Sequence, residues 1–220
     1  NHFGEIKYTA SVASPDLGLI TNIGDSHLEY LKNRKGVFAE KSALINETIN
    51  RGGKVFINND DKILREFGKT LKNKTTFALN EKADYKASIK GYDKLARPQI
   101  EIKSKKNDFT STLPISGEKN VLNFTAAFAI ASELGLANSQ IQKAVKKIKS
   151  YNKRLEIKNH KNFTLINDTY NANPDSMKSS LDILNRIESR KRKIAVLGDM
   201  FELGNESKSK HIELANFINQ

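Results

Sequence analysis

A histidine follows a short apolar run near the start of the chain, in a place where functional side chains often gather. Residues 17–20 are Leu, Gly, Leu and Ile, and the polar segment 21–29 that comes next contains His27. The apolar run is typical of a buried strand in a parallel sheet, and ligands bind beyond the carboxyl ends of such strands. His27 is therefore a candidate metal ligand or general base. A structural histidine that caps the next helix would fit its position equally well.

A lysine lies on the apolar side of the next predicted element, a helix over residues 35–50. The apolar positions at helical spacing on this stretch are Val37, Phe38, Leu44, Ile45 and Ile49. Lys41 falls on or near the same stripe, although burial of an ammonium group costs free energy and lowers its pKa. From the residues alone we favour a simpler interpretation, in which the stem of Lys41 lies along the surface and its charge stays in water.

A third candidate is the polar segment 167–177, which joins a predicted strand to a helix that begins with proline. Such a loop presents side chains and helix N–H groups to an anion. Asn173 could instead serve only as the N-cap of the helix. That alternative does not explain Asp168, Tyr170 and Asn171.

A fourth candidate is Gly198 with Asp199, at the end of another apolar run, although a structural turn explains these two residues more simply. Several common catalytic signatures are absent from the sequence. It contains no Gly-x-x-x-x-Gly-Lys-Ser/Thr loop, no Gly-x-Gly-x-x-Gly and no Gly-x-Ser-x-Gly. Because there is no cysteine, disulfides, thiolate zinc sites and a cysteine nucleophile are excluded.

Strands and helices alternate through the first part of the chain, as in a doubly wound sheet. The predicted strands cover residues 16–22, 54–61 and 75–79, and the predicted helices cover 35–50 and 61–71. Residues 85–113 alternate apolar and polar side chains between turn residues, so we expect an antiparallel meander there. Two helices, 120–134 and 139–149, would complete a first domain over residues 1–150.

A second, smaller domain is expected over residues 151–220. Its predicted elements are a hairpin at 155–158 and 163–167, a helix at 174–187, a strand at 193–197 and a helix at 207–218. The fold class is thus α/β. A parallel-sheet domain with an antiparallel meander precedes a partial Rossmann-like domain, which has fewer strands than a complete one.

The composition is that of a globular protein with excess positive charge. The 37 Lys and Arg residues exceed the 25 Asp and Glu residues by 12. The basic residues are spread along the chain, with a single run from Arg190 to Lys193, so we favour solvated lysines over a polyanion-binding surface. No apolar stretch approaches the roughly 18 residues of a membrane span, and the sequence starts without the features of a signal peptide.

Taken together and in order, several segments resemble the Mur ligase family. They are Thr21-Asn22-Ile23-Gly24, His27-Leu28-Glu29, Lys41, Asn120-Val121-Leu122-Asn123, Arg154, residues 167–177, and residues 195–204. The last two segments resemble most closely the branch of the family that adds D-alanyl-D-alanine. Two positions depart from the family pattern. Tyr30-Leu31-Lys32 stands where Gly-Phe-Gly is common, and Lys119 stands where histidine is common.

The resemblance implies roles for the first two candidates in catalysis and metal binding. His27 would bind one of two Mg²⁺ ions. Lys41 would be carbamylated by CO₂, which turns its ammonium group into an anion that can also bind Mg²⁺. This implication reverses the interpretation of Lys41 that the residues alone favour.

The resemblance also implies a nucleotide site and a substrate site. Asn120 would contact the adenine of ATP, Arg154 its phosphates and Asp168 its ribose. Three further residues would lie near the nucleotide and the incoming dipeptide, namely Tyr170, Asn171 and Asn173.

The implied activity is that of an ATP-dependent ligase of peptidoglycan synthesis, a cytoplasmic monomer that neither binds nucleic acid nor inserts into membranes. It would activate UDP-MurNAc-tripeptide as an acyl phosphate, which the amine of D-Ala-D-Ala attacks. This chain would hold the later part of the central ATPase domain and the first part of the C-terminal domain. The UDP-binding domain, the phosphate loop and a metal-binding glutamate would precede residue 1, so we expect the isolated chain to be inactive.

Two groups of alternatives stay open. One is a related enzyme, either a sister ligase that adds another amino acid or a folylpolyglutamate-type synthetase. The other is a non-catalytic basic α/β module that binds nucleic acid, whose binding would weaken steeply with salt.

Overall fold

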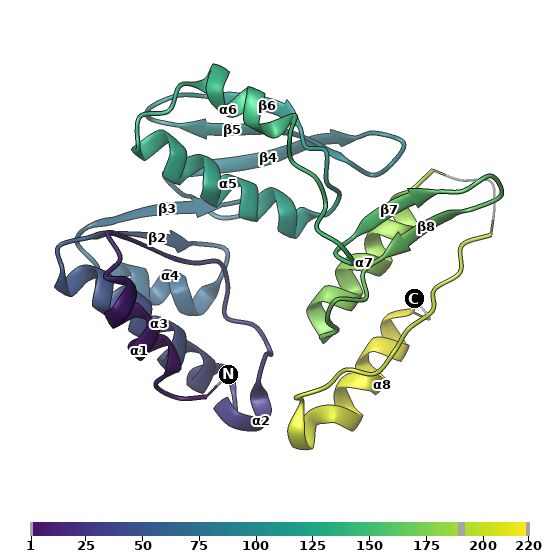
Figure 1. The fold of residues 1–220 in the computed structure, drawn as a ribbon, viewed down its shortest axis with the longest axis horizontal. Helices are drawn as coiled ribbons and strands as arrows, with labels where there is room; N and C mark the ends of the chain where they lie inside the picture. Colours follow the sequence, from purple (N-terminus) through teal and green to yellow (C-terminus); the bar gives the residue numbers. More distant parts are fainter. Residues whose placement is uncertain (1, 189–191, 219–220) are drawn as a thin grey trace.

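Two units make up the protein in a computed structural model, which describes residues 2–188 and 192–218 (Figure 1). The first unit is a six-stranded sheet with helices on both faces. The second is a hairpin with two helices of three turns or more. Residues 146–155 connect them between the last helix of the first unit and the hairpin.

The sheet of the first unit runs in chain order from one edge to the other. Its strands are β1 (Leu17–Ile20), β2 (Lys54–Asn58), β3 (Lys74–Ala78), β4 (Tyr85–Tyr92), β5 (Pro98–Ser104) and β6 (Phe109–Thr112). Strands β1 to β4 are parallel, β5 runs antiparallel to β4, and β6 runs antiparallel to β5. The predicted parallel sheet with an attached antiparallel meander is confirmed.

Strand β2 shows how the sheet is packed on both faces. Val55 and Ile57 belong to a core with α3 (Arg34–Asn50) and α4 (Lys62–Lys69). Phe56, which points the other way because side chains alternate along a strand, belongs to a core with α5 (Glu118–Glu133) and α6 (Asn138–Val145). All three side chains are fully buried, and each contributes about 1.5–3 kcal/mol to folding. Two short helices, α1 (Glu5–Ala13) and α2 (Leu28–Leu31), were not expected from the sequence.

A charged cluster fixes the end of α5 to the sheet. Glu133 accepts hydrogen bonds from Lys54 at 2.6 Å and from the Tyr85 hydroxyl at 2.9 Å, and it pairs with Lys106 at 2.9 Å. Burial alone would raise the pKa of Glu133, but these three contacts lower it to about 2. The carboxylate therefore stabilises the first unit in its ionised form.

The second unit contains most of the elements expected from the sequence. They are β7 (Glu156–Asn159), β8 (Thr164–Asn167), α7 (Pro174–Arg186), a single 3-10 turn, η1 (Gly204–Glu206), and α8 (Ser207–Ile218). β7 and β8 form the predicted antiparallel hairpin. A small core of Met177, Met200, Leu203 and Leu214 joins the helices to the loop before α8.

The strand predicted at residues 193–197 is wrong, because this segment has irregular backbone. Ile194 and Val196 are 62% and 93% exposed. Within the described ranges, β7 and β8 pair only with each other, so residues 193–197 lack the hydrogen bonds to a neighbouring strand that a strand needs.

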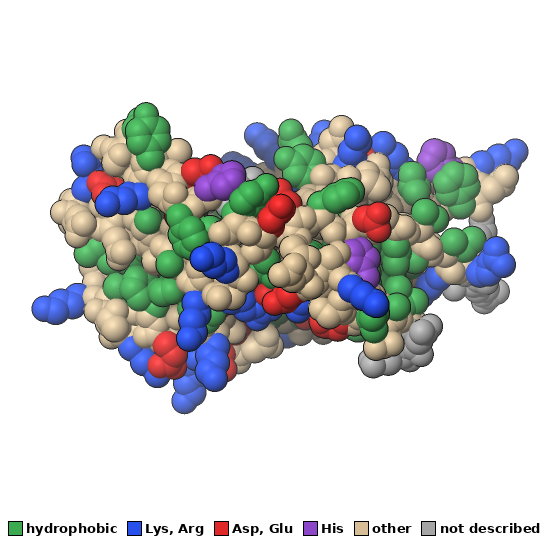
Figure 2. Space-filling view, turned by 90° about the horizontal axis from the view of Figure 1, so that it is seen from below, with side chains coloured by type: hydrophobic (Ala, Val, Ile, Leu, Met, Phe, Trp, Pro, Cys, Tyr) green, Lys and Arg blue, Asp and Glu red, His purple; other side chains and the backbone are tan. Residues whose placement is uncertain are grey.

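Charge is mixed over the surface that Figure 2 shows. On this face the described lysine and arginine side chains are interspersed with acidic and apolar ones and form no single basic patch. Two members of the predicted basic run, Arg190 and Lys191, lie outside the described residues. No helix in the described part of the chain has the length and apolar character to cross a bilayer.

Candidate active site between the two units

A cavity of about 250 Å³ lies where the second unit meets the N-terminal end of α5. Its walls come from α5, the connecting residues 149–155, the end of β8 and the first turns of α7. Asn120, Arg154 and Asp168 all line it. The fold therefore brings together the three residues predicted to contact the nucleotide, although up to 48 positions separate them in the sequence.

Local contacts hold each of these three side chains. Asn120 donates through Nδ2 to the carbonyl oxygen of Ser116 at 2.7 Å. The guanidinium of Arg154 stacks on the ring of Tyr170, with its central carbon 4.0 Å from the ring centroid. The stacking holds the planar guanidinium in one orientation while its edge stays available for hydrogen bonds.

Asp168 joins three parts of the second unit. Its Oδ1 accepts from the backbone N–H of Leu155 at 3.0 Å, and its Oδ2 accepts from the hydroxyl of Ser180 at 2.5 Å. A carboxylate offers about four lone-pair sites, so two remain after these bonds. They are sufficient to accept both hydroxyl groups of a ribose.

The three predicted substrate residues are not among those that line this cavity. Asn173 is the N-cap of α7, and its Oδ1 accepts from Ser176 N at 2.9 Å, as the structural alternative expects. Asn171 accepts from Ala172 N at 2.9 Å. Tyr170 is 57% exposed and borders the cavity only through its contact with Arg154.

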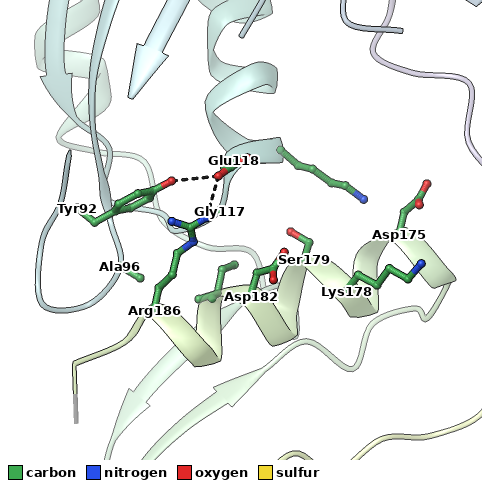
Figure 3. Close-up of a pocket in the computed structure, with 11 residues that line it drawn as sticks. Tyr92, Ala96, Gly117, Glu118, Asp175, Lys178, Ser179, Asp182 and Arg186 are labelled. Carbon is green, nitrogen blue, oxygen red and sulfur yellow. Dashed lines mark hydrogen bonds and ion pairs between the residues drawn. The ribbon is translucent and has the colours of Figure 1, made fainter. Parts of the chain in front are cut away.

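A second cavity, of about 220 Å³, lies alongside the first and shares Lys119 with it. Figure 3 shows Tyr92 and Arg186 turned toward Glu118, which accepts a hydrogen bond from each at 3.2 Å. This cluster links β4, α5 and α7 across the two units. Partial burial lowers the pKa of Lys119, and the carboxylate of Asp175 opposes that shift.

The loop after β1 is held by side chains from the neighbouring strand and helix. The buried amide of Asn58 donates to the carbonyl oxygen of Thr21 at 2.7 Å. Asp61 accepts from Ile23 N at 2.6 Å through one oxygen and, through the other, caps α4 by accepting from Ile63 N at 2.9 Å. Asp61 was not predicted as a site residue, although an aspartate between a strand and a helix is a recognisable capping signal.

Lys41 points from α3 toward this loop. Its Nζ donates to the carbonyl oxygen of Asn22 at 3.0 Å, and the side chain is half-buried. Desolvation lowers the pKa of Lys41, and the negative charge of Asp61 opposes the shift. The ammonium group thus contacts the loop as well as lying near the surface, and the role of Lys41 stays a prediction.

His27 stands at the N-cap position of α2, but its side chain makes no capping hydrogen bond. Its Nδ1 instead lies 2.5 Å from Oε2 of Glu202, in the second unit. Nearby, Asp25 binds Arg34 at 2.7 Å and Lys210 at 3.2 Å. The hydrogen bond from Arg34 is the main reason why the pKa of Asp25 lies below its ordinary value.

The donors suited to a metal are few in this region. Among the described residues, no group of three or more His, Asp or Glu side chains could hold a metal ion. His27 offers one imidazole nitrogen, and the ammonium form of Lys41 would repel a cation. An anionic form of Lys41 would add the oxygen ligands that Mg²⁺ prefers.

Comparisons with known proteins agree with the fold and with the family resemblance. Residues 1–131 match the Mur ligase middle domain, and residues 153–220 match the Mur ligase, glutamate ligase domain. The chain is 32% identical to the UDP-N-acetylmuramoyl-tripeptide–D-alanyl-D-alanine ligase of Bacillus subtilis, over 98% of this chain and 46% of that protein. The chain thus spans about half the length of the curated relatives it matches.

Solved structures match over the whole chain. MurF from Acinetobacter baumannii superimposes with a TM-score of 0.89 at 29% identity, covering 100% of this chain and 48% of that one. MurF from Thermotoga maritima, solved in complex with ADP, superimposes with a TM-score of 0.88 at 26% identity, covering 99% and 50%. Because more than half of its residues match the Mur ligase middle domain, this chain belongs to the Mur ligase family.

Proposed function

We propose that the protein containing this chain is an ATP-dependent ligase of peptidoglycan precursor synthesis. It joins D-alanyl-D-alanine to UDP-MurNAc-tripeptide in the cytoplasm. The observation that carries this proposal is the cavity between the two units, where Asn120, Arg154 and Asp168 converge. The B. subtilis relative bears the name of this activity, and a T. maritima structure of the same fold was solved with ADP.

In this proposal the cavity binds the nucleoside part of ATP. Asn120 contacts the adenine, and Asp168 accepts hydrogen bonds from the ribose hydroxyls through its remaining lone pairs. Arg154, already oriented by Tyr170, directs its guanidinium fork to the phosphates. We also propose that the first domain ends at residue 150, within the connecting segment, and that Tyr170, Asn171 and Asn173 lie toward the dipeptide.

Carbamylation of Lys41 would give this chain a second metal ligand besides His27. The neutral amine attacks the carbon of CO₂, forming an N–C bond and releasing one proton, which leaves a carbamate anion. Desolvation lowers the pKa of Lys41 and so increases the fraction of reactive amine. The carbamate oxygens and the imidazole of His27 would then be the ligands that this chain offers to Mg²⁺.

The reaction has two steps. An oxygen of the tripeptide carboxylate attacks the γ-phosphorus of ATP, and ADP leaves. The amine of D-Ala-D-Ala then attacks the acyl carbon, and phosphate leaves as the amine loses a proton. Bound magnesium would neutralise the charge on the transferring phosphoryl group. The residues of this chain bind and orient the nucleotide, so most of their contribution is positioning.

An acceptor screen with the complete gene product tests this function. We expect ATP-dependent phosphate release and an amide product with UDP-MurNAc-tripeptide and D-Ala-D-Ala, measured by mass spectrometry. Efficient turnover with a single amino acid would indicate a sister ligase. Glutamate addition to a folate would indicate a folylpolyglutamate-type enzyme. Salt-sensitive binding of DNA or RNA without any ligase activity would favour the non-catalytic alternative.

A further inference from the structure

The shortest polar contact between the loop after β1 and the second unit joins the side chains of His27 and Glu202. Neither the segment around His27 nor residues 195–204 predicts this pairing from its own sequence. Nδ1 of His27 lies 2.5 Å from Oε2 of Glu202, and 175 positions separate the two residues. The side chains are 31% and 41% exposed. The contact is therefore partly shielded from water.

Both residues have an unusual backbone conformation. The φ angle is 54° at His27 and 61° at Glu202, in the left-handed region that residues other than glycine rarely adopt. This conformation costs free energy, and such residues cluster at functional sites. Two of them meet here, one from each unit.

The surrounding contacts dock the Glu202 segment onto the His27 loop. The backbone N–H of Glu29 donates to the carbonyl oxygen of Glu202 at 3.4 Å. Gly204 lies directly against Glu29, where an added Cβ would come within 3.5 Å of its Cα. Lys210 pairs with Asp25 at 3.2 Å. The backbone of the segment that carries Glu202 is thus docked on the His27 loop by contacts on either side of the His27–Glu202 pair.

We propose that Glu202 is a positioning residue that orients His27 as a metal ligand only while the second unit is docked on the first. This inference rests on the proposed function. A carboxylate only accepts hydrogen bonds, so the pair keeps a proton on Nδ1 and leaves the lone pair of Nε2 free for a metal. Metal-binding histidines commonly donate their second ring N–H to a carboxylate in this way. Docking of the second unit would then be coupled to metal binding in the first.

The test compares Mn²⁺ binding to variants of the complete gene product, with ADP present, by electron paramagnetic resonance of free Mn²⁺. Glu202→Ala should weaken binding about 10- to 100-fold. Glu202→Gln, whose amide oxygen still accepts, should weaken it less. The matched control is Glu206→Gln, which removes a carboxylate from the same segment, where it pairs with Lys210 only at 4.0 Å, and should bind as the wild type does. In a His27→Ala background, Glu202→Ala should cause no further loss.

A second readout follows the imidazole itself. In ¹⁵N NMR, with His27 assigned by its absence from His27→Ala, the Nδ1–H tautomer should dominate in the wild type and decline in Glu202→Ala. Wild-type Mn²⁺ affinity and an unchanged tautomer in Glu202→Ala would overturn the inference, as would an equal loss in Glu206→Gln. Failure of the wild type to bind Mn²⁺ with ADP would instead overturn the proposed metal site, and this role with it.

Discussion

Replacement of Asp168 by asparagine should separate its structural role from its role in nucleotide binding. The asparagine oxygen can still accept from Leu155 N, and the Ser180 hydroxyl already has a second acceptor, Ser176 O, at 3.0 Å. We therefore expect the free energy of unfolding to change by less than about 1 kcal/mol. A hydrogen bond from a ribose hydroxyl to a carboxylate contributes about 1.5–3 kcal/mol. Its loss should weaken ADP binding roughly 10- to 100-fold.

Calorimetric titration with ADP and with 2′,3′-dideoxy-ADP measures this effect. The wild type should prefer ADP by about the same 10- to 100-fold, whereas Asp168→Asn should bind the two nucleotides almost equally. Asp182→Asn is the matched control. This substitution also removes one negative charge, but Asp182 lies on α7 and lines only the neighbouring cavity.

Two results would refute this reasoning. If Asp168→Asn kept the wild-type preference for ADP, its carboxylate would not contact the ribose. If Asp182→Asn lost as much affinity, the effect would be one of general charge. If the first result came with a large fall in Tm, the role of Asp168 would be purely structural.

Three further predictions concern groups around the site and in the core. Lys41→Arg should abolish the carbamate signal that ¹³C-bicarbonate gives in NMR and lower ligase activity about 100-fold; a persistent signal would contradict the assignment. Asp25→Asn should lower Tm at pH 7. Because Arg34 holds the pKa of Asp25 below 3.8, this difference should shrink as the pH falls below 3.8, and a constant difference would exclude the ion pair as its cause. Glu133→Gln should lower the free energy of unfolding by about 1–3 kcal/mol at pH 7. Because the pKa of Glu133 is about 2 rather than 4.5, this loss, measured by urea unfolding, should disappear between pH 4.5 and pH 2. A loss that persists at pH 2 would show that the ionised carboxylate is not its cause.

The sheet could be predicted from sequence because its signals are local. The apolar run of β2 indicates a strand buried on both faces, and the alternation along β4 and β5 indicates strands buried on one face. Asn173 was likewise foreseen as a possible helix cap, since a cap depends on neighbours in the sequence. The segment 193–197 shows the limit of this reasoning. Its composition suits a strand, but a strand forms only where another strand supplies hydrogen bonds, and that is a property of the tertiary structure.

The candidate site was predicted in part. The family resemblance named Asn120, Arg154 and Asp168, and only the structure shows that one cavity gathers them. The pairing of Glu202 with His27 could not be read from spacing, because it depends on how the second unit docks. No local sequence pattern predicts a contact between residues so far apart in the chain.

A crystal structure of the complete gene product with ADP would test most directly whether the cavity between the units binds the nucleotide. We predict adenine density beside Asn120, the ribose within hydrogen-bonding distance of Asp168, and the phosphates extending toward Arg154. ADP bound elsewhere, for example in the neighbouring cavity beside Tyr92 and Arg186, would contradict the nucleotide site proposed for this chain.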